Sequence, residues 1–437
     1  MTKAKQVAVI GAGPAGLYGA RELAEAGVNV TLFNRDIKPG GLAEYGIYPS
    51  KVTMKNGLRN QFKKILETPS LRYLGNLSVG DDADLSLNDL RALGYQAILV
   101  TTGAQGTKWL GLDGEDLKGV YHAKDVVYHY NHLPPFSQKD FRFGSRCLVV
   151  GAGNVMIDIA RYLIREAKVD EVTALVRRGP AEVKFTKKEL EYVAANMDLG
   201  LLDAEFERVA ENMRSVNQDP DEAKAFLLSA LPKAQERVSD TKFRFRFLCS
   251  PKAMHGEDGL LTHVDVEENL LTLKDGDTKP RGTGEIVPLE AETIIFAIGD
   301  KVDENFGLPT EWSEFIKNES PRFPQDEKTY EVAGAEDIFV AGWSRKASDG
   351  LVGYARKDGI NGAKAVLEYL EGLDVADSVD ALLDEKLAGL NKPIVTGADA
   401  LRLYDVEAAE AEKRGLDEFK FDDNESMLEA IGLLMRS

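Results

Sequence analysis

Two glycine turns, each between a short apolar strand and an amphipathic helix, constrain the fold of this chain more than any other feature. The first begins with QVAVI, continues through GAGPAG and LYGARELAEAG, and ends with NVTLFN, so residues 6–34 form a complete βαβ unit. Gly11 permits the tight turn, Gly13 lets the backbone approach a pyrophosphate, and Gly16 packs the helix against the strand. The helix N-terminus then faces the anion, which predicts a dinucleotide site.

The last residue of this unit departs from the usual pattern. Asn34 stands where such sites commonly carry an acidic ribose ligand. Its amide can still hydrogen-bond to hydroxyl groups, but it carries no charge to discriminate against a 2′-phosphate.

The second glycine turn lies in residues 146–178, where RCLVV precedes GAGNVMIDIARYLIREA and the strand EVTALVRR. Gly151 and Gly153 repeat the phosphate turn, but the sixth position is Met156, which predicts a looser contact between helix and strand. Two such units predict an α/β fold with two Rossmann-like dinucleotide-binding domains.

Two arginines end the second unit. Arg177 and Arg178 occupy the place where an NAD site would carry an acid, and permanent cations suit a 2′-phosphate. They favour NADP(H), with NAD(H) still possible. The alternative is that they form an ordinary solvated strand end.

Cysteine content and charge exclude several classes of function. Cys147 and Cys249 are the only cysteines and no CxxC pair exists, so a dithiol relay and an iron-sulfur cluster both lack their ligands. The 437 residues contain 72 acids against 54 bases, a net charge of −18, which argues against a nucleic-acid partner. We find no apolar run long enough for a membrane span and no signal peptide, so we expect a cytoplasmic protein without a membrane partner.

Two dinucleotide sites without redox cysteines suggest a flavin that exchanges hydride with a nicotinamide. Other glycine-ended segments support this reading: PGG at 39–41, TTGA at 101–104 with Thr102 and Gly103, TIIFAIGD at 293–300 and DIFVAGW at 337–343. Each alone is an ordinary strand terminus.

With these residues in view, the chain resembles the adrenodoxin reductase-type ferredoxin-NADP reductases, and it is similar to the flavoprotein half of glutamate synthase. The similar segments run from end to end: GAGPAGLYGARELA, GGLAEYGIYP, TTGA, DGEDLKGV, GAGNVMIDIAR, VRRGPAEVKFTKKEL, FRFLCSP, GWSRKASDGLVG with KDG, and KPIVTGADALRLYDVE. The resemblance implies FAD and NADP(H) as cofactors and ferredoxin, or an iron-sulfur partner subunit, as the electron partner.

The resemblance also implies a domain plan and a set of contact residues. An FAD-binding domain of residues 1–107 and 331–437 would be interrupted by an NAD(P)-binding domain of residues 108–330. FAD would be lined by Gly11, Gly13, Ala15, Gly16, Asn34, Gly41, Leu42, Thr102, Gly103, Gly342, Trp343, Gly350, Leu351 and Val352, and NADP(H) by Gly151, Gly153, Asn154, Val155, Arg177, Arg178 and Glu189. The family's Arg after GLV, His after APD and GP after GWxKR are here Glu44, Lys51 and Ala347-Ser348.

Few catalytic side chains are needed, because stacking the nicotinamide on the flavin and excluding water lets hydride pass directly. We expect Trp343 to shape the flavin face and Asp158 or Glu189 to hold the nicotinamide end or handle a proton. Asp158 lies in the first turns of a helix, where an acid often only compensates the helix dipole.

A basic stripe is the candidate docking surface for an acidic electron carrier. Lys51, Lys55, Arg59 and Lys63 recur every four residues in a stretch without acids, which places them on one helical face. The alternative is a solvated basic helix. Residues 371–437 hold 17 acids and 7 bases, so the charge is polarised toward an acidic C-terminal extension.

No metal is expected. His122, His129 and His132 form no regular ligand pattern with a third ligand type. Residues 188–240 are polar and predicted helical, and residues 242–300 alternate in a way that predicts a small antiparallel meander.

The first functional hypothesis is a freestanding NADPH-ferredoxin oxidoreductase. The alternative is an electron-entry subunit of a larger 2-oxoacid:acceptor or glutamate synthase-like complex, and a third reading is a flavin monooxygenase.

Overall fold

A computed structural model describes residues 3–435 and divides the chain into two compact units. The first unit comprises residues 1–108, 128–138 and 299–437, of which 3–435 are described, and the second comprises residues 109–127 and 139–298. The second unit is thus inserted in the first, but its end differs from the boundary expected above. Residues 299–330 belong to the first unit, because the last strand of the inserted sheet ends at Phe296 and the chain then pairs with residues 106–107.

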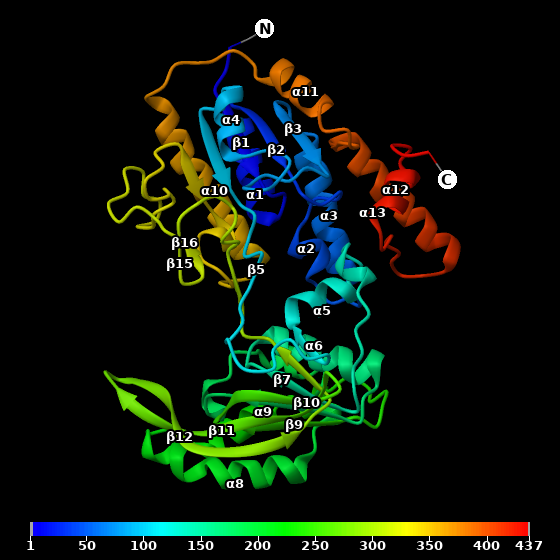
Figure 1. Cartoon of the computed structure of the whole chain (residues 1–437), viewed down its shortest axis with the longest axis vertical. Helices are drawn as coiled ribbons and strands as arrows, with labels where there is room; N and C mark the ends of the chain where they lie inside the picture. Colours follow the sequence, from blue (N-terminus) through cyan, green and yellow to red (C-terminus); the bar gives the residue numbers. More distant parts are fainter. Residues whose placement is uncertain (1–2, 436–437) are drawn as a thin grey trace. The chain divides into compact units, whose positions relative to one another are not determined.

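A six-stranded sheet forms the centre of the first unit, in the order β17-β4-β1-β2-β3-β18 (Figure 1). The strands are parallel except for β18, which runs antiparallel to β3. Their bounds are β1 (Gln6–Ile10), β2 (Asn29–Phe33), β3 (Leu71–Gly75), β4 (Ala97–Val100), β17 (Ile338–Val340) and β18 (Val395–Thr396). Short pairs are formed by β5 (Gly106–Thr107) with β14 (Asp300–Lys301) and by β15 (Thr310–Glu311) with β16 (Glu314–Phe315).

Both faces of this sheet are buried, which explains why its strands read as continuous apolar runs. In β1, Val7 and Val9 belong to one hydrophobic core, whereas Ala8 and Ile10 belong to the core on the opposite face. The helices of this unit are α1 (Pro14–Glu25), α2 (Leu42–Tyr45), α3 (Val52–Leu66), α4 (Leu87–Leu93), α10 (Val352–Glu371), α11 (Asp380–Ala388), α12 (Gly397–Arg414) and α13 (Asn424–Ala430), and α5 (Ala123–Tyr130) spans the change of unit.

Helices α1 and α10 pack together through glycine, although more than 300 residues separate them. A Cβ atom on Gly359 would lie 2.1 Å from the carbonyl oxygen of Ala15, and one on Gly19 would lie 2.9 Å from that of Gly359. The close packing of helix backbones therefore depends on the absence of side chains at these positions.

A five-stranded parallel sheet, in the order β6-β13-β7-β8-β9, forms the centre of the second unit. Its strands are β6 (Val120–His122), β7 (Arg146–Val150), β8 (Glu171–Val176), β9 (Lys242–Phe247) and β13 (Thr293–Phe296), with helices α6 (Asn154–Tyr162), α7 (Lys187–Leu190), α8 (Leu199–Ser215) and α9 (Pro220–Leu228). The predicted fold class and the helical region before residue 240 are confirmed.

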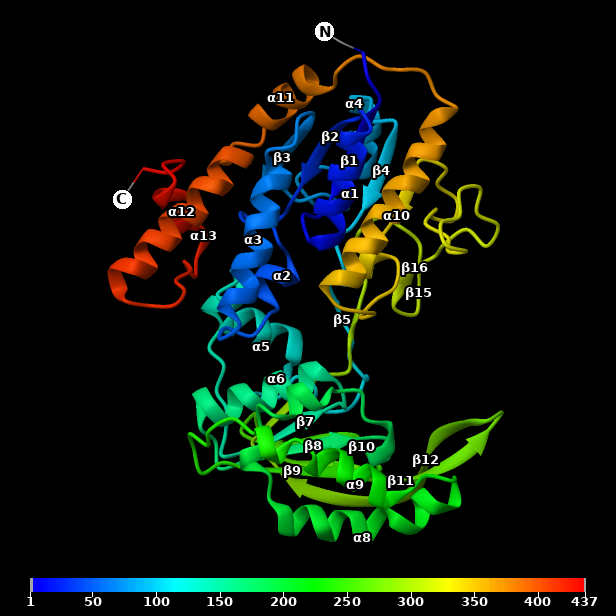
Figure 2. The same cartoon turned by 180° about the vertical axis from the view of Figure 1, so that it is seen from behind.

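The predicted antiparallel meander is also present. It consists of β10 (Cys249–Glu257), β11 (Leu260–Lys274) and β12 (Asp277–Glu290), in that order. Figure 2 shows β11 and β12 continuing as a two-stranded arm beyond the rest of this sheet. Among the described helices, none is both long enough and apolar enough to cross a bilayer.

Candidate dinucleotide sites

The glycine turn of the first unit has the backbone geometry that phosphate binding needs. Gly11 adopts a φ of +102° and its amide donates to the carbonyl of Phe33 at the end of β2. The space where Gly13 would carry a Cβ is open, and no side chain caps the N-terminus of α1. The first amides of α1 are therefore left without a side-chain cap beside open space, which fits a pyrophosphate.

Three other predicted segments of the first unit meet this turn. The amide of Gly40 donates to the carbonyl of Ala12 at 2.7 Å, and Thr101 Oγ1 donates to the carbonyl of Gly11 at 2.8 Å. A Cβ on Gly342 would lie only 2.7 Å from the Cβ of Ala15. The segments around residues 40, 101 and 342 thus surround the start of α1.

The predicted residues near Trp343 are joined by hydrogen bonds. Ser344 Oγ lies 3.2 Å from Thr102 Oγ1 and accepts from the amide of Gly103 at 2.9 Å. Trp343 Nε1 donates to the carbonyl of Asp349, next to Gly350. Leu351 is 76% exposed and is the N-cap residue of α10, whose first amides have no side-chain cap, so this loop offers both an exposed apolar side chain and uncapped backbone amides. A flavin ring with polar edges fits that combination.

Asp358 is a functional candidate that sequence reasoning missed. It is 3% exposed and accepts hydrogen bonds from the amide of Gly342 at 2.7 Å and from Tyr330. It also forms a buried ion pair with Arg345 at 2.7 Å. The KDG triplet carried the signal, but only the fold shows that this carboxylate holds the Gly342–Ser344 turn in place.

Asn34 does something other than the predicted ribose contact. Its Oδ1 accepts from the amide of Ala12 at 3.0 Å, and its Nδ2 donates to the carbonyls of Asp36 and Lys38. Because the amide is 8% exposed and already bonded on both sides, Asn34 joins the glycine turn to the following loop. A neutral side chain suits these mixed donor and acceptor contacts better than a carboxylate.

The glycine turn of the second unit repeats the first. The amide of Gly151 donates to the carbonyl of Leu175, and the space beside Gly153 is open. Met156 is fully buried at the sixth position, and α6 has no side-chain cap. Here too the first amides of the helix face open space, while Val155 is exposed beside them.

The segment after β8 lies against this turn. The amide of Lys184 donates to the carbonyl of Ala152 at 2.8 Å, and the amide of Thr186 donates to Asn154 Oδ1 at 3.1 Å. Thr186 caps α7 by accepting from the amide of Glu189. Asn154, Lys184 and Glu189 are therefore brought to one place in the second unit.

The arginine pair has two different environments. Arg177 is exposed, whereas Arg178 Nη1 lies 2.8 Å from Glu182 Oε1. Burial opposes the charge of Glu182, but hydrogen bonds from Thr278 and Arg178 hold its pKa below the usual value. Arg178 and Glu182 line a pocket of about 390 Å³ together with Val183, Lys184, Asp277, Thr278 and Lys279. The lining holds three cations and two carboxylates, and Glu182 and Asp277 pair with Arg178 and Lys279, so Lys184 is the cation of this pocket with no carboxylate partner among its lining residues.

Asp158 lies half-buried on α6, in the second unit with Glu189, and Trp343 lies in the first unit. Their catalytic roles stay predictions. Within residues 3–435, His122, His129 and His132 do not form a group of possible metal ligands, but two other histidines do, as described below.

The predicted docking stripe is largely covered. Lys55 is fully buried and pairs with Glu418, and Arg59 contacts both Glu418 and Glu44 at 2.6 Å. Lys63 pairs with Asp405 at 2.8 Å. Figures 1 and 2 both show α12 and α13 alongside α3. The prediction that Lys55 and Arg59 face a partner is therefore wrong, because the acidic C-terminal extension occupies that face.

Glu44 explains one departure from the family pattern. It is 1% exposed, and Lys38, Arg59 and Lys420 all converge on its carboxylate. Burial alone would raise the pKa of Glu44, but Lys420, Lys38 and Arg59 together hold it well below the usual value. Glu44 thus lies in a cluster of buried cations at the position where the family pattern has an arginine.

Comparison with known proteins agrees with this geometry. The chain is 28% identical to the NADPH-ferredoxin reductase FprA of Mycobacterium leprae, over 94% of each chain. It is 29% identical to the mitochondrial NADPH:adrenodoxin oxidoreductase of Drosophila melanogaster, over 99% of this chain and 94% of that one. The structure of Mycobacterium tuberculosis FprA in complex with NADPH superposes with a TM-score of 0.82 at 25% identity, covering 98% of this chain and 100% of that one.

These relatives confirm the resemblance stated from the sequence. The family described as pyridine nucleotide-disulphide oxidoreductase matches residues 5–342. Both cysteines are buried in this chain, so the disulphide chemistry in the family description has no counterpart here. The chain belongs to the pyridine nucleotide-disulphide oxidoreductase family.

Proposed function

We propose that this protein is an FAD-dependent oxidoreductase that takes hydride from NADPH and passes single electrons to a ferredoxin-type iron-sulfur protein. The observation that carries the proposal is the pair of open glycine turns, one in each unit, with two consecutive arginines directly after the strand that ends the second. Relatives named NADPH-ferredoxin reductase and NADPH:adrenodoxin oxidoreductase along nearly the whole chain support it.

In this proposal FAD lies in the first unit. The amides of α1 from Ala15 onward bind its pyrophosphate, and the Gly41–Leu42 and Thr102–Gly103 segments border it. Trp343 and the loop from Gly350 to Val352 cover the ring and exclude water, which strengthens every polar contact inside. Bound FAD supplies the ability to accept a hydride and to release electrons one at a time.

NADPH lies in the second unit, with its pyrophosphate at the amides of Asn154 and Val155. Arg177 is exposed and free of the Glu182 contact, so we assign it the main hold on the 2′-phosphate, with Arg178 and Lys184 beside it. Glu189 orients the nicotinamide end. Asp158 is the alternative for that role.

The test is steady-state reduction of a ferredoxin by NADPH and by NADH. Arg177→Ala and Arg178→Ala should raise the KM for NADPH by about 10- to 100-fold and leave that for NADH nearly unchanged, since charge-assisted bonds to phosphate are each worth ~1.5–3 kcal/mol. Arg142→Ala removes a guanidinium from an 85% exposed side chain of the same unit and serves as the control. Unchanged NADPH constants in both variants would refute the assignment.

The same assay separates the other hypotheses. A chain that reduces ferredoxin rapidly by itself excludes an obligatory subunit of a larger oxidoreductase, whereas activity only after copurification with other subunits favours that alternative. Oxygen consumption coupled to a hydroxylated product would instead indicate a monooxygenase.

We infer that an acidic partner docks at the C-terminal end of α3. Lys64 is exposed there, and Lys63 is partly exposed beside it. Lys64→Glu should raise the KM for ferredoxin at low ionic strength, and Lys364→Glu, on the exposed face of α10, is the control. Equal effects of the two variants would place the docking surface elsewhere.

A further inference from the structure

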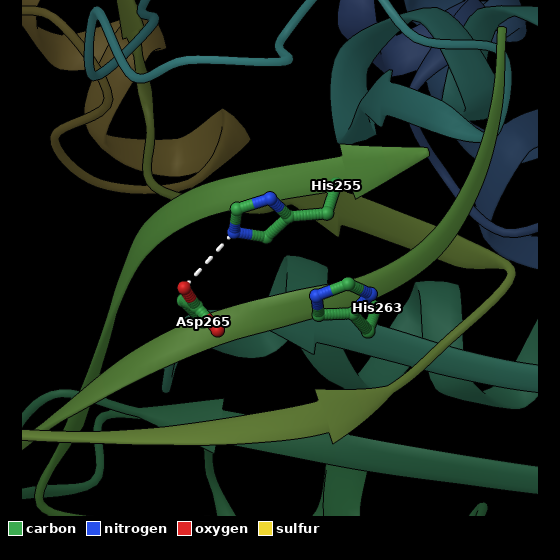
Figure 3. A group of neighbouring side chains, drawn as sticks. All are labelled: His255, His263 and Asp265. Carbon is green, nitrogen blue, oxygen red and sulfur yellow. Dashed lines mark hydrogen bonds and ion pairs between the residues drawn. The ribbon is translucent and has the colours of Figure 1, made fainter. Parts of the chain in front are cut away.

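Two histidines and an aspartate meet on the solvent side of the antiparallel sheet in the second unit (Figure 3). His255 of β10 lies directly opposite His263 of β11, and their rings stack with centroids 4.5 Å apart. Asp265 follows two residues after His263 and so lies on the same face of the strand. Its Oδ2 is 2.9 Å from His255 Nε2, and one ligand atom from each residue lies within 4.8 Å of the others.

The strand register beneath this cluster is fixed by the buried face of the same sheet. Val264 and Val266 alternate with His263 and Asp265 along β11 and are fully buried in the core of the unit. A slip of one residue would expose these valines, so the ladder fixes the positions of all three polar side chains.

A bulge at Thr262 places a hydroxyl group beside one ligand. Thr262 has no partner in the ladder, since Leu261 pairs with Gly256 and His263 with His255. Its hydroxyl donates its single proton to the carbonyl of His255 at 3.2 Å and lies 3.2 Å from His263 Nδ1. With the hydroxyl proton on that carbonyl, a neutral His263 would donate from Nδ1 to the hydroxyl oxygen and keep a free lone pair on Nε2. A histidine held in this way by its other nitrogen is typical of metal ligands.

We propose that His255, His263 and Asp265 form a surface site for a divalent transition-metal ion of the zinc class. Two imidazole nitrogens and one carboxylate suit zinc, nickel or copper, whereas magnesium and calcium prefer oxygen ligands alone. Tetrahedral bonds of about 2.0–2.2 Å would place ligand atoms roughly 3.4 Å apart, so the widest separation must close by up to about 1.4 Å and the contact between His255 and Asp265 must open by about 0.5 Å. His255 and Asp265 are 44% and 29% exposed, which leaves their side chains room for that adjustment. Water would complete the coordination.

The surrounding charges permit a cation. Glu290 lies opposite His263 on β12 and is paired with Arg146. Lys252, three residues before His255 on β10, is paired with Glu267 at 3.1 Å. Arg146 and Lys252 are thus each paired with a carboxylate. The site uses none of the residues assigned to NADP(H) above, so it stands or falls independently of the proposed reductase activity.

The test uses the full-length, FAD-loaded chain without a polyhistidine tag, freed of metal by EDTA and dialysed. Titration calorimetry with Zn²⁺ should show one ion per chain at micromolar affinity, and the same titration with Mg²⁺ should show no binding. His255→Ala and His263→Ala should each weaken Zn²⁺ binding at least tenfold, because each removes one of three protein ligands. His129→Gln alters a histidine of the first unit and should bind as the wild type does.

Two results would overturn the proposal: no saturable Zn²⁺ binding by the wild type, or binding that survives both alanine variants unchanged. The circular dichroism spectrum in the absence of added Zn²⁺ serves as the folding control. It should be the same in the wild type, His255→Ala and His263→Ala, so a loss of Zn²⁺ binding in those variants reports the site itself.

Discussion

Lys38, in the loop after β2, forms a buried ion pair with Glu407 of the C-terminal extension. Lys38 Nζ lies 2.6 Å from Glu407 Oε2, and the two side chains are 0% and 5% exposed. They belong to a buried cluster in which four cations face three carboxylates: Lys38, Lys55, Arg59 and Lys420 with Glu44, Glu407 and Glu418. Glu407→Gln would leave four cations facing two carboxylates.

We expect Glu407→Gln to lower the free energy of unfolding by about 3–5 kcal/mol, the cost of leaving one member of a buried pair unpaired. Lys38→Met should cost less, because burial raises the pKa of Glu407 and the carboxyl can take up a proton once the lysine is gone. The loss in free energy of unfolding of the double variant should therefore be about 1–3 kcal/mol smaller than the sum of the losses of the two single variants.

Urea unfolding of the FAD-loaded chain measures these differences, with flavin fluorescence reporting the first unit and circular dichroism reporting the whole chain. Asp337→Asn breaks an exposed pair with Arg91 and should cost at most about 1 kcal/mol. If Glu407→Gln lowers the free energy of unfolding by no more than Asp337→Asn does, the buried cluster does not hold the C-terminal extension in place. The same conclusion follows if the loss in the double variant equals the sum of the losses in the two single variants.

Three further outcomes are expected. Burial raises the pKa of Cys147 and of Cys249 to about 12, so neither thiol should react with Ellman's reagent at pH 8 until the chain is unfolded; a rapidly reacting native thiol would contradict this. Asp358→Asn should weaken FAD binding at least tenfold in equilibrium dialysis, because the Gly342 turn loses a charged acceptor, and an unchanged affinity would exclude that role. Burial lowers the pKa of Lys420 to about 8, so between pH 8 and 10 the folded chain has lost a proton that the unfolded chain retains. The free energy of unfolding of the wild type should therefore increase relative to that of Lys420→Met as pH rises. A constant difference between their urea midpoints over this pH range would refute this.

Sequence patterns among neighbouring residues were enough to predict the parts of the fold that depend on local interactions. The glycine turns, their flanking strands and the meander follow from periodicity within about thirty residues. The end of the inserted unit did not follow, because residues 299–330 contain only two-residue strands whose pairing partners are set by the fold.

Long-range pairing explains the rest of what was missed. The sequence predicts that Lys55 is a surface residue of a basic helix, whereas the structure shows that it is buried against Glu418. The alignment of His255 with His263 depends on a bulge at Thr262 that no local pattern shows.

The glycine contact between α1 and α10 bears on the order in which the protein can fold during synthesis. The ribosome completes residues 109–298 before it makes β17 and α10, so the inserted unit can fold while the first unit still lacks an edge strand and a covering helix. At about 5–20 residues per second, the chain from Lys108 to β17 takes on the order of 10–50 s to emerge. During that interval the apolar face of α1 and the free edge of β4 are natural sites for a chaperone, and we expect nascent chains stalled before β17 to depend on one.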